Sequence, residues 1–321
     1  MNNDSPAILV VGAGAIGALF GSALASQGAR VSVVCRSEYD QVRRNGYHIR
    51  STLLGEHRFQ PHRVLRRVTE CDTPPDYLIL TVKVTEGLDR AALIKPAVGP
   101  DTVIVLIENG VAIEEEIAAA FPRNELLSCL AIVGVSRTGG GTIHHQALGL
   151  LTLGRYPTGT TARAAQLAAW FEAARIGCKL TDRIVTARWQ KAVWNATFNP
   201  ISIMGGVLDT AAILRTPRDR EFVRRAMQEV CDVAAAVGHP MPAGIAAQMI
   251  ERTQAMPAYK TSMALDFENG RPMELEAILG NTVRAGRDAG VAMPTLEALY
   301  ALAKMIENRP VLITDAATTE R

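Results

Sequence analysis

Residues 7–17 read AILVVGAGAIG, and this stretch decides the fold. Its first five residues form a continuous apolar run, which is typical of a strand buried on both faces. Gly12, Gly14 and Gly17 follow as G-x-G-x-x-G, a helical pattern then runs to Gly28, and residues 31–35 indicate a second strand. Strand, glycine loop, helix and strand form the context in which this motif binds a dinucleotide.

Each glycine of the loop has its own expected role. Gly12 permits a tight turn, Gly14 lets the backbone approach a pyrophosphate, and Gly17 lets helix and strand pack closely. The pyrophosphate would lie at the positive N-terminal end of the helix. A glycine-rich turn with a purely structural role is the alternative. We expect a cofactor to bind to the whole loop, that is, to Gly12, Ala13, Gly14, Ala15, Ile16 and Gly17.

The end of the second strand indicates which dinucleotide binds. NAD sites place Asp or Glu there to bind the ribose 2′-hydroxyl. This chain has Cys35-Arg36-Ser37 instead. A guanidinium can pair with a 2′-phosphate in a bidentate way, whereas a carboxylate would repel it. Arg36 therefore predicts NADP(H), unless it is an ordinary surface arginine.

Two further buried-type strands, at 77–82 and 102–107, end in polar residues. Ligands of open α/β sheets gather at the carboxyl ends of strands, so Lys83 and Asn109 are expected to face the cofactor. Lys83 could also be a solvated loop lysine, and Asn109-Gly110 a turn dipeptide. The remaining expected elements are a short hairpin within 39–75, helices at 85–95, 112–121 and 161–174, and strands at 126–135, 142–145, 150–153 and 178–180.

From Asp182, a plausible N-cap, only helical periodicity remains. The expected helices are 182–198, 217–237, 241–256, 274–289 and 294–308. The predicted fold is α/β: a Rossmann-type doubly wound sheet over 1–181, followed by an all-helical domain over 182–309 and a tail over 310–321. A ligand would bind in the cleft between the two domains.

The first of these helices carries an unusual polar row. Lys191, Asn195 and Asn199 are spaced i, i+4 and i+8, so they follow one side of the helix over about 12 Å. Their neighbours are largely apolar, and buried donors without acceptors cost roughly 1–3 kcal/mol each. A bound carboxylate and carbonyl would satisfy them; a solvent-facing stripe is the alternative. In the loop before the 274 helix, Ser262 adds a hydroxyl, and Glu274 opens that helix or merely caps it.

Composition narrows the class of protein. The 321 residues are 48% hydrophobic and 21% charged with a net charge of +2, so neither nucleic acid nor a membrane is an expected partner. Five dispersed cysteines without a Cys-x-x-Cys pair, and no signal peptide, indicate reduced thiols in the cytoplasm. The adjacent His144 and His145 point to opposite faces of a strand, so no metal site is expected. Apolar faces of the helical domain are compatible with a homodimer.

The motifs that carry a resemblance to a known family are GAGAIG at 12–17, Arg36, Lys83, Glu108-Asn109-Gly110, Lys191-xxx-Asn195-xxx-Asn199-Pro200, Ser262 and Glu274. Together they resemble the ketopantoate reductase (2-dehydropantoate 2-reductase) family, and the resemblance covers nearly the whole chain. The resemblance implies NADPH-dependent reduction of 2-dehydropantoate to (R)-pantoate, on the route to coenzyme A. It implies that Lys191 is the general acid, that Asn195, Asn199 and Ser262 bind substrate, and that Arg36 holds the 2′-phosphate. Lys83, Asn109, Glu274 and the backbone of Val135 would contact the cofactor, with Asn109 also near the substrate.

Other functions stay open at this point. The substrate could be a different 2-oxo acid, because the motif does not specify the rest of the substrate pocket. The Lys-xxx-Asn helix is also similar to that of β-hydroxyacid dehydrogenases, although their glycine-rich substrate-binding segment is not found here. An NADP(H)-binding sensor without chemistry would keep the glycine loop and Arg36, but it would have no need of Lys191, Asn195 and Asn199.

Overall fold

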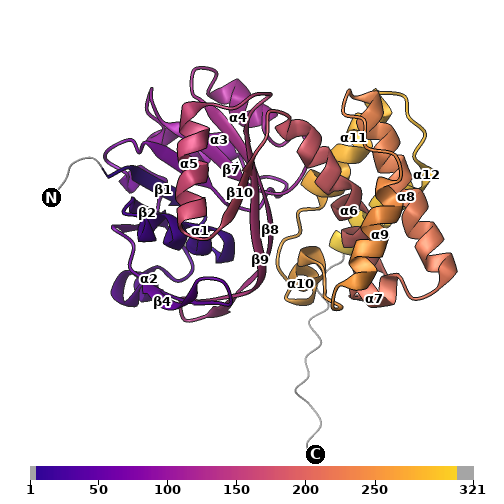
Figure 1. Cartoon of the computed structure of the whole chain (residues 1–321), viewed down its shortest axis with the longest axis horizontal. Coiled ribbons are helices and arrows are strands. Elements are labelled where there is room, and N and C mark those ends of the chain that lie inside the picture. Colours follow the sequence, from indigo (N-terminus) through magenta and orange to yellow (C-terminus); the bar gives the residue numbers. More distant parts are fainter. Residues whose placement is uncertain (1–4, 309–321) are drawn as a thin grey trace, which may run out of the picture.

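The computed structural model describes residues 5–308, which form a sheet-containing part and a helical part (Figure 1). The strands are β1 (Ala7–Val11), β2 (Arg30–Val34), β3 (Tyr47–Ser51), β4 (Gly55–Phe59), β5 (Val64–Leu65), β6 (Tyr77–Leu80), β7 (Val103–Ile107), β8 (Leu126–Gly139), β9 (Thr142–Arg155) and β10 (Gly177–Leu180). They form one sheet in the order β4-β3-β9-β8-β7-β6-β1-β2-β5, and β10 pairs with β9. The expected tail at 310–321 lies outside the described residues.

The central strands are parallel, and helices cover both faces of the sheet. Helices α1 (Ala15–Ser26) and α5 (Ala162–Ala173) pack on one face through Phe20 and Phe171. Helices α3 (Arg90–Ile94) and α4 (Glu115–Ala120) pack on the other through Ile94 and Ile117. This part also contains α2 (Tyr39–Asn45) and two short 3-10 helices, Val68–Glu70 and Lys95–Ala97. This is the predicted doubly wound arrangement. Because β1, β6 and β7 are parallel neighbours, their carboxyl ends lie along the same edge of the sheet.

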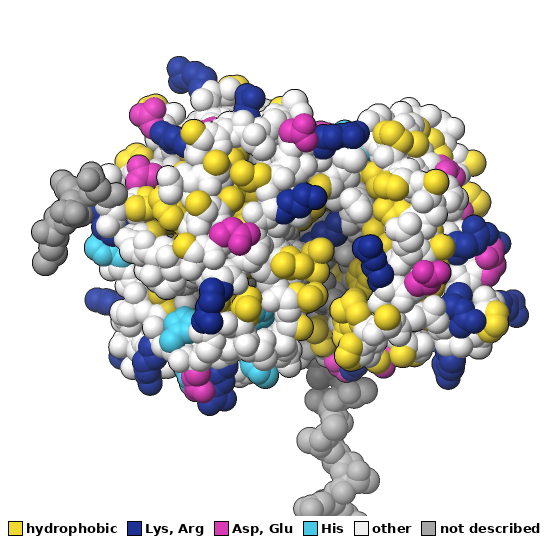
Figure 2. Space-filling view, viewed as in Figure 1, with side chains coloured by type: hydrophobic (Ala, Val, Ile, Leu, Met, Phe, Trp, Pro, Cys, Tyr) yellow, Lys and Arg dark blue, Asp and Glu magenta, His cyan; other side chains and the backbone are white. Residues whose placement is uncertain are grey.

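The helical part is built around α6 (Ile184–Met204). The other helices are α7 (Thr210–Ile213), α8 (Pro217–Ala236), α9 (Ile245–Ala255), α10 (Ser262–Glu268), α11 (Asn281–Asp288) and α12 (Pro294–Glu307), with a π-helical turn at Glu276–Gly280 before α11. Val193 and Phe198 of α6 are fully buried in a second core shared with α8, α11 and α12. Figure 2 shows apolar side chains beside the hollow where the two parts meet. Among the described helices, none combines the length and hydrophobicity needed to cross a bilayer.

Several expected helices begin late because the backbone adopts left-handed conformations. Gly87 (φ +80°), Ala112 (φ +55°) and Gly244 (φ +75°) interrupt the segments predicted as 85–95, 112–121 and 241–256. Helices α3, α4 and α9 therefore start at Arg90, Glu115 and Ile245. Periodicity alone marked the apolar positions of these segments but not their turns.

Three further expectations were wrong. Asp182 does not cap α6; the cap position is Arg183, and the Asp182 carbonyl accepts hydrogen bonds from Gly159 and Thr158. Ser262 lies not in a loop but at the first position of α10, where the Thr261 side chain caps the helix. The two short strands expected at 142–145 and 150–153 are one strand, β9, which pairs antiparallel with β8 across irregularities in register.

Candidate active site

The glycine loop is held rigidly at the end of β1. Gly12 has φ +93°, and its carbonyl accepts from the Thr81 hydroxyl at 2.8 Å. The Ala13 carbonyl accepts from the Tyr47 hydroxyl at 2.9 Å. Gly14 is the N-cap of α1, and no side chain caps the helix. The first backbone N–H groups of α1 are thus available to an anion.

The expected residues of the loop differ in exposure. Ala13 is buried, whereas Ile16 is partly buried and packs against the apolar core between the sheet and helices α1 and α5. Val135 on β8 packs against the same core. Arg36 is exposed just beyond β2, and no hydrogen bond or ion pair engages its side chain within residues 5–308. The loop therefore presents backbone N–H groups, and Arg36 presents a cation that no carboxylate of residues 5–308 neutralises.

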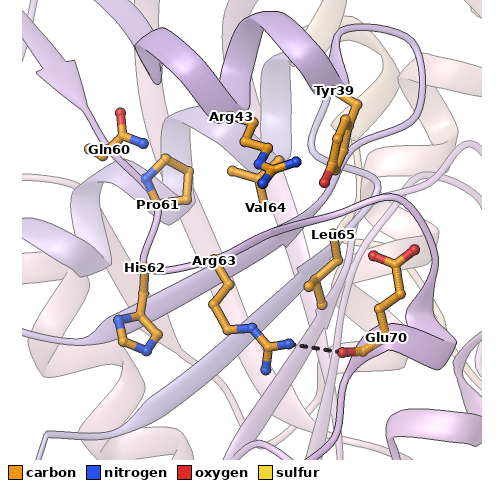
Figure 3. Close-up of a pocket in the computed structure, with 9 residues that line it drawn as sticks. All are labelled: Tyr39, Arg43, Gln60, Pro61, His62, Arg63, Val64, Leu65 and Glu70. Carbon is orange, nitrogen blue, oxygen red and sulfur yellow. Dashed lines mark hydrogen bonds between the residues drawn. The ribbon is translucent and has the colours of Figure 1, made fainter.

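A cavity of about 520 Å³ lies on the outer edge of the sheet between α2 and β5 (Figure 3). Tyr39, Arg43, His62, Arg63 and Glu70 are among the residues that line it. None of the predicted site residues does. Its volume alone therefore does not make it the candidate active site.

Lys191 lies where α6 meets the sheet. Its Nζ donates to Asn109 Oδ1 at 2.8 Å and to the Ala131 carbonyl on β8 at 2.8 Å. Burial lowers the pKa of Lys191 to about 8, and the nearby Arg188 charge acts in the same direction. An ammonium has three donors, so one remains for a ligand.

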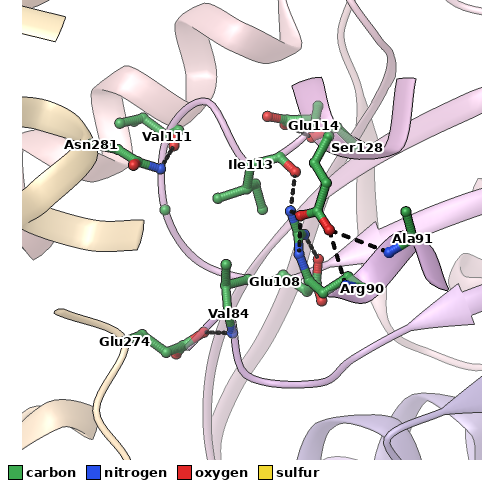
Figure 4. Close-up of polar contacts among 12 residues, drawn as sticks. Val84, Arg90, Ala91, Glu108, Val111, Ile113, Glu114, Ser128, Glu274 and Asn281 are labelled. Atoms are coloured by element: carbon green, nitrogen blue, oxygen red, sulfur yellow. Dashed lines mark hydrogen bonds and ion pairs between the residues drawn. The ribbon is translucent and has the colours of Figure 1, made fainter. Parts of the chain in front are cut away.

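Glu274 links the two parts of the molecule. One carboxylate oxygen accepts from Asn109 Nδ2 at 3.1 Å and the other from the backbone N–H of Val84 at 3.1 Å, as seen for Val84 in Figure 4. Burial raises the pKa of Glu274, and the hydrogen bond from Asn109 opposes that rise. Lys83 pairs with Asp266 at 2.6 Å and donates to the Pro272 carbonyl at 3.2 Å. Lys191, Asn109, Glu274 and residues 83–84 thus form one polar chain.

The two asparagines of the row lie in different surroundings. Asn195 lines a narrow cavity of about 10 Å³ together with Lys191, Arg188, Gly110, Leu130, Ala192 and Ile278. Asn199 is 1% exposed, and neither its Oδ1 nor its Nδ2 has a partner among the described residues. Ser262 is exposed and makes no side-chain hydrogen bond there, although its helix α10 packs against α6. The row is therefore not a solvent-facing stripe.

The sequence analysis assigned no roles to a set of buried charged residues that surround the polar contacts of Lys191, Asn109 and Glu274. Arg90 pairs with Glu108 at 2.8 Å and with Glu116 at 2.8 Å, and Arg188 pairs with Glu114 (Figure 4 shows Arg90, Glu108 and Glu114). Burial raises the pKa of Glu108 to about 8, against the effect of both arginines. Charged residues inside apolar segments were the available signal, but their partners are distant in sequence.

Within residues 5–308, Glu86, Glu276 and Glu307 form a group of carboxylates close enough to share a metal ion. Lys304 already pairs with all three, at 3.0, 3.2 and 2.8 Å. The group is therefore accounted for as an ion-pair cluster that joins α12 to the loop after β6.

Known proteins share both parts of this architecture. Residues 8–158 match the family described as ketopantoate reductase PanE/ApbA, and residues 183–307 match its C-terminal family. The chain belongs to the ketopantoate reductase family. Ketopantoate reductases are oxidoreductases, and this chain is an enzyme of that type.

Individual relatives agree with this assignment. The 2-dehydropantoate 2-reductase of Nostoc sp. is 30% identical, over 96% of this chain and 97% of the relative. The crystal structure of 2-dehydropantoate 2-reductase from Methylococcus capsulatus is 53% identical, with a TM-score of 0.90, and covers 95% of this chain and 99% of that one. A D-mandelate dehydrogenase determined with NADH and anilino(oxo)acetate shares the fold, at 23% identity, a TM-score of 0.85, and coverage of 94% and 98%.

Proposed function

We propose that this ketopantoate reductase reduces 2-dehydropantoate to (R)-pantoate with NADPH, and that Lys191 is the general acid. The observation that carries the proposal is the placement of Lys191: its Nζ donates to Asn109 and to the Ala131 carbonyl, and the residue lines a narrow cavity together with Asn195. A desolvated ammonium on a rigid helix stabilises negative charge on a carbonyl oxygen and can also supply the proton.

The residues present fit the cofactor. The N-terminus of α1 is uncapped, and a Cβ built on Gly14 would meet nothing closer than the Gly12 carbonyl at 3.8 Å, so a pyrophosphate has room against the backbone. Residues 12–17 would hold the pyrophosphate, and Arg36 would hold the 2′-phosphate. The nicotinamide end would be contacted by Lys83, Asn109, Glu274 and the backbone of Val135. NADPH, when bound, supplies the hydride that reduces the ketone carbon.

The chain's own residues complete the reaction. Lys191 donates a hydrogen bond to the ketone oxygen and transfers its proton as charge develops there. Lys191 is left as a neutral amine, and solvent returns the proton. Asn195, Asn199 and Ser262 would donate to the substrate carboxylate, with Asn109 close by. Neutral donors leave Lys191 as the cation of this group that faces the ketone.

Arg36→Ala should weaken NADPH relative to NADH by roughly 10- to 150-fold, because charge-assisted hydrogen bonds contribute about 1.5–3 kcal/mol. The measurement is the ratio of kcat/KM for the two cofactors in wild type and variant. Exposed Arg44 provides a matched control, and Arg44→Ala should leave the ratio unchanged. A wild-type preference for NADH would refute the cofactor proposal.

Asn199→Leu should increase the stability of the free protein and raise KM for the oxo acid. The side chain buries two polar atoms that have no partner among the described residues, and removing such groups should raise the free energy of unfolding by about 1–3 kcal/mol. The same change removes a donor for the substrate, so KM for the oxo acid should rise. Urea denaturation and steady-state kinetics measure the two effects.

Asn195→Ala is the comparison, because Asn195 is only partly buried. It should raise KM without the gain in stability. A loss of stability in Asn199→Leu with an unchanged KM would show that Asn199 is structural.

A panel of 2-oxo acids separates the remaining alternatives. NADPH oxidation should be fastest with 2-dehydropantoate. Faster turnover of another 2-oxo acid, or of a β-hydroxyacid in the reverse direction, would reassign the substrate. NADPH binding without oxidation of any member would favour a sensor.

We further propose that the two domains span residues 1–181 and 182–309. We also propose that the enzyme is cytoplasmic and belongs to pantothenate biosynthesis, and that it binds a small 2-oxo acid and needs no metal ion. A homodimer is compatible with the apolar helix faces, and a dimeric ketopantoate reductase from Staphylococcus aureus shares the fold. Sedimentation velocity tests the assembly.

A further inference from the structure

Arg188 lies one turn before Lys191 on α6 and is 2% exposed. A buried guanidinium needs acceptors, and three kinds are present. Its Nη1 donates to the carbonyl oxygens of Glu108 at 2.8 Å and Gly110 at 3.2 Å. Its Nε donates to Ser128 Oγ at 2.8 Å, and the Glu114 carboxylate forms an ion pair with it. Nη2 has no partner among the described residues.

The two carbonyls that Arg188 holds flank Asn109. The Asn109 side chain in turn accepts from Lys191 and donates to Glu274. We propose that Arg188 is a positioning residue for the reduction: it fixes the backbone at 108–110 so that Asn109 holds the Lys191 ammonium toward the substrate. This inference rests on the proposed role of Lys191.

The charge of Arg188 has a second effect on Lys191. Both residues line the same narrow cavity. After burial, Arg188 is the main cause of the low pKa of Lys191, while Glu274 and the Cys129 thiol act in the opposite direction. Beyond Arg188 lie its partner Glu114 and the Arg90–Glu108 pair. Removal of the Arg188 charge should therefore raise the pKa of Lys191.

A residue that only stabilised the fold would not change the pH dependence of the reaction. The readout is therefore the pH profile of kcat/KM for the oxo acid at saturating NADPH. A general acid must be protonated, so kcat/KM falls as the pH rises through the pKa of Lys191. A higher pKa moves this alkaline limb to higher pH.

The test uses a double variant, Arg188→Gln with Glu114→Gln, because Arg188→Gln alone would leave a buried carboxylate without its partner. We expect the double variant to lose about 10- to 100-fold in kcat/KM at pH 7 through misplacement of Asn109, and to show its alkaline limb at higher pH. Glu114→Gln alone keeps the Arg188 cation and should not move the limb upward.

Arg188→Lys separates position from charge. It keeps a cation beside Glu114, but a single ammonium does not reproduce the fork that binds two carbonyls. For Arg188→Lys we expect a lower kcat/KM, with the alkaline limb of the pH profile at the same pH as in the wild type. A double variant with wild-type kcat/KM, or with an unshifted limb, would overturn the inference. Lys191→Ala measured in parallel keeps the two proposals apart: activity in that variant refutes the role of Lys191 itself.

Discussion

Lys191→Ala should lower kcat by about 10²–10⁴-fold, the usual size of a general-acid contribution. The reason is the position of the ammonium, which Asn109 and the Ala131 carbonyl hold with one donor left for the substrate. The affinity for NADPH should change little, because the glycine loop and Arg36 lie on other elements. Steady-state kinetics and NADPH fluorescence titration measure the two quantities.

The wild-type pH profile gives an independent check on this role. With the pKa of Lys191 at about 8, kcat/KM should be high below that pH and fall above it as the ammonium loses its proton. The alkaline limb should be absent from the residual activity of Lys191→Ala. Near-normal turnover in that variant, or an unchanged limb, would remove Lys191 from the mechanism.

Gly14→Ala and Gly17→Ala should fail in different ways. Gly14 has room for a methyl group in the free protein, so Gly14→Ala should fold normally. The methyl group would then occupy space that the pyrophosphate needs, and NADPH affinity should fall by 10-fold or more, which is roughly 1.4 kcal/mol. Isothermal titration calorimetry measures the loss.

Gly17 has no such room. A Cβ there would lie 2.6 Å from Thr81 Oγ1, 2.8 Å from Val10 Cγ1 and 2.9 Å from the Gly12 carbonyl. Gly17→Ala should therefore cost about 1–3 kcal/mol in the free energy of unfolding, the usual penalty for overpacking. Equal stability of the two variants, or normal NADPH affinity in Gly14→Ala, would contradict the roles assigned to the loop.

The order of elements could be predicted where the sequence signal is local. The apolar run before Gly12 specifies a strand buried on both faces, and the spacing of the glycines specifies the turn into α1. Helical periodicity placed α5, α8 and α12 nearly at their observed limits. Left-handed residues such as Ala112 carry no comparable signal, so the starts of several helices were wrong.

The amino-acid sequence by itself determined the Rossmann-type fold, the glycine loop and the row Lys191, Asn195 and Asn199, because each depends on spacing within one element. Only the tertiary structure decided which groups surround that row. The contacts of Lys191 with Asn109 and Ala131, and of Arg188 with Glu108, Gly110 and Glu114, join residues 60 to 82 positions apart. Desolvation and charge at Lys191 arise from those contacts, and no local pattern encodes them.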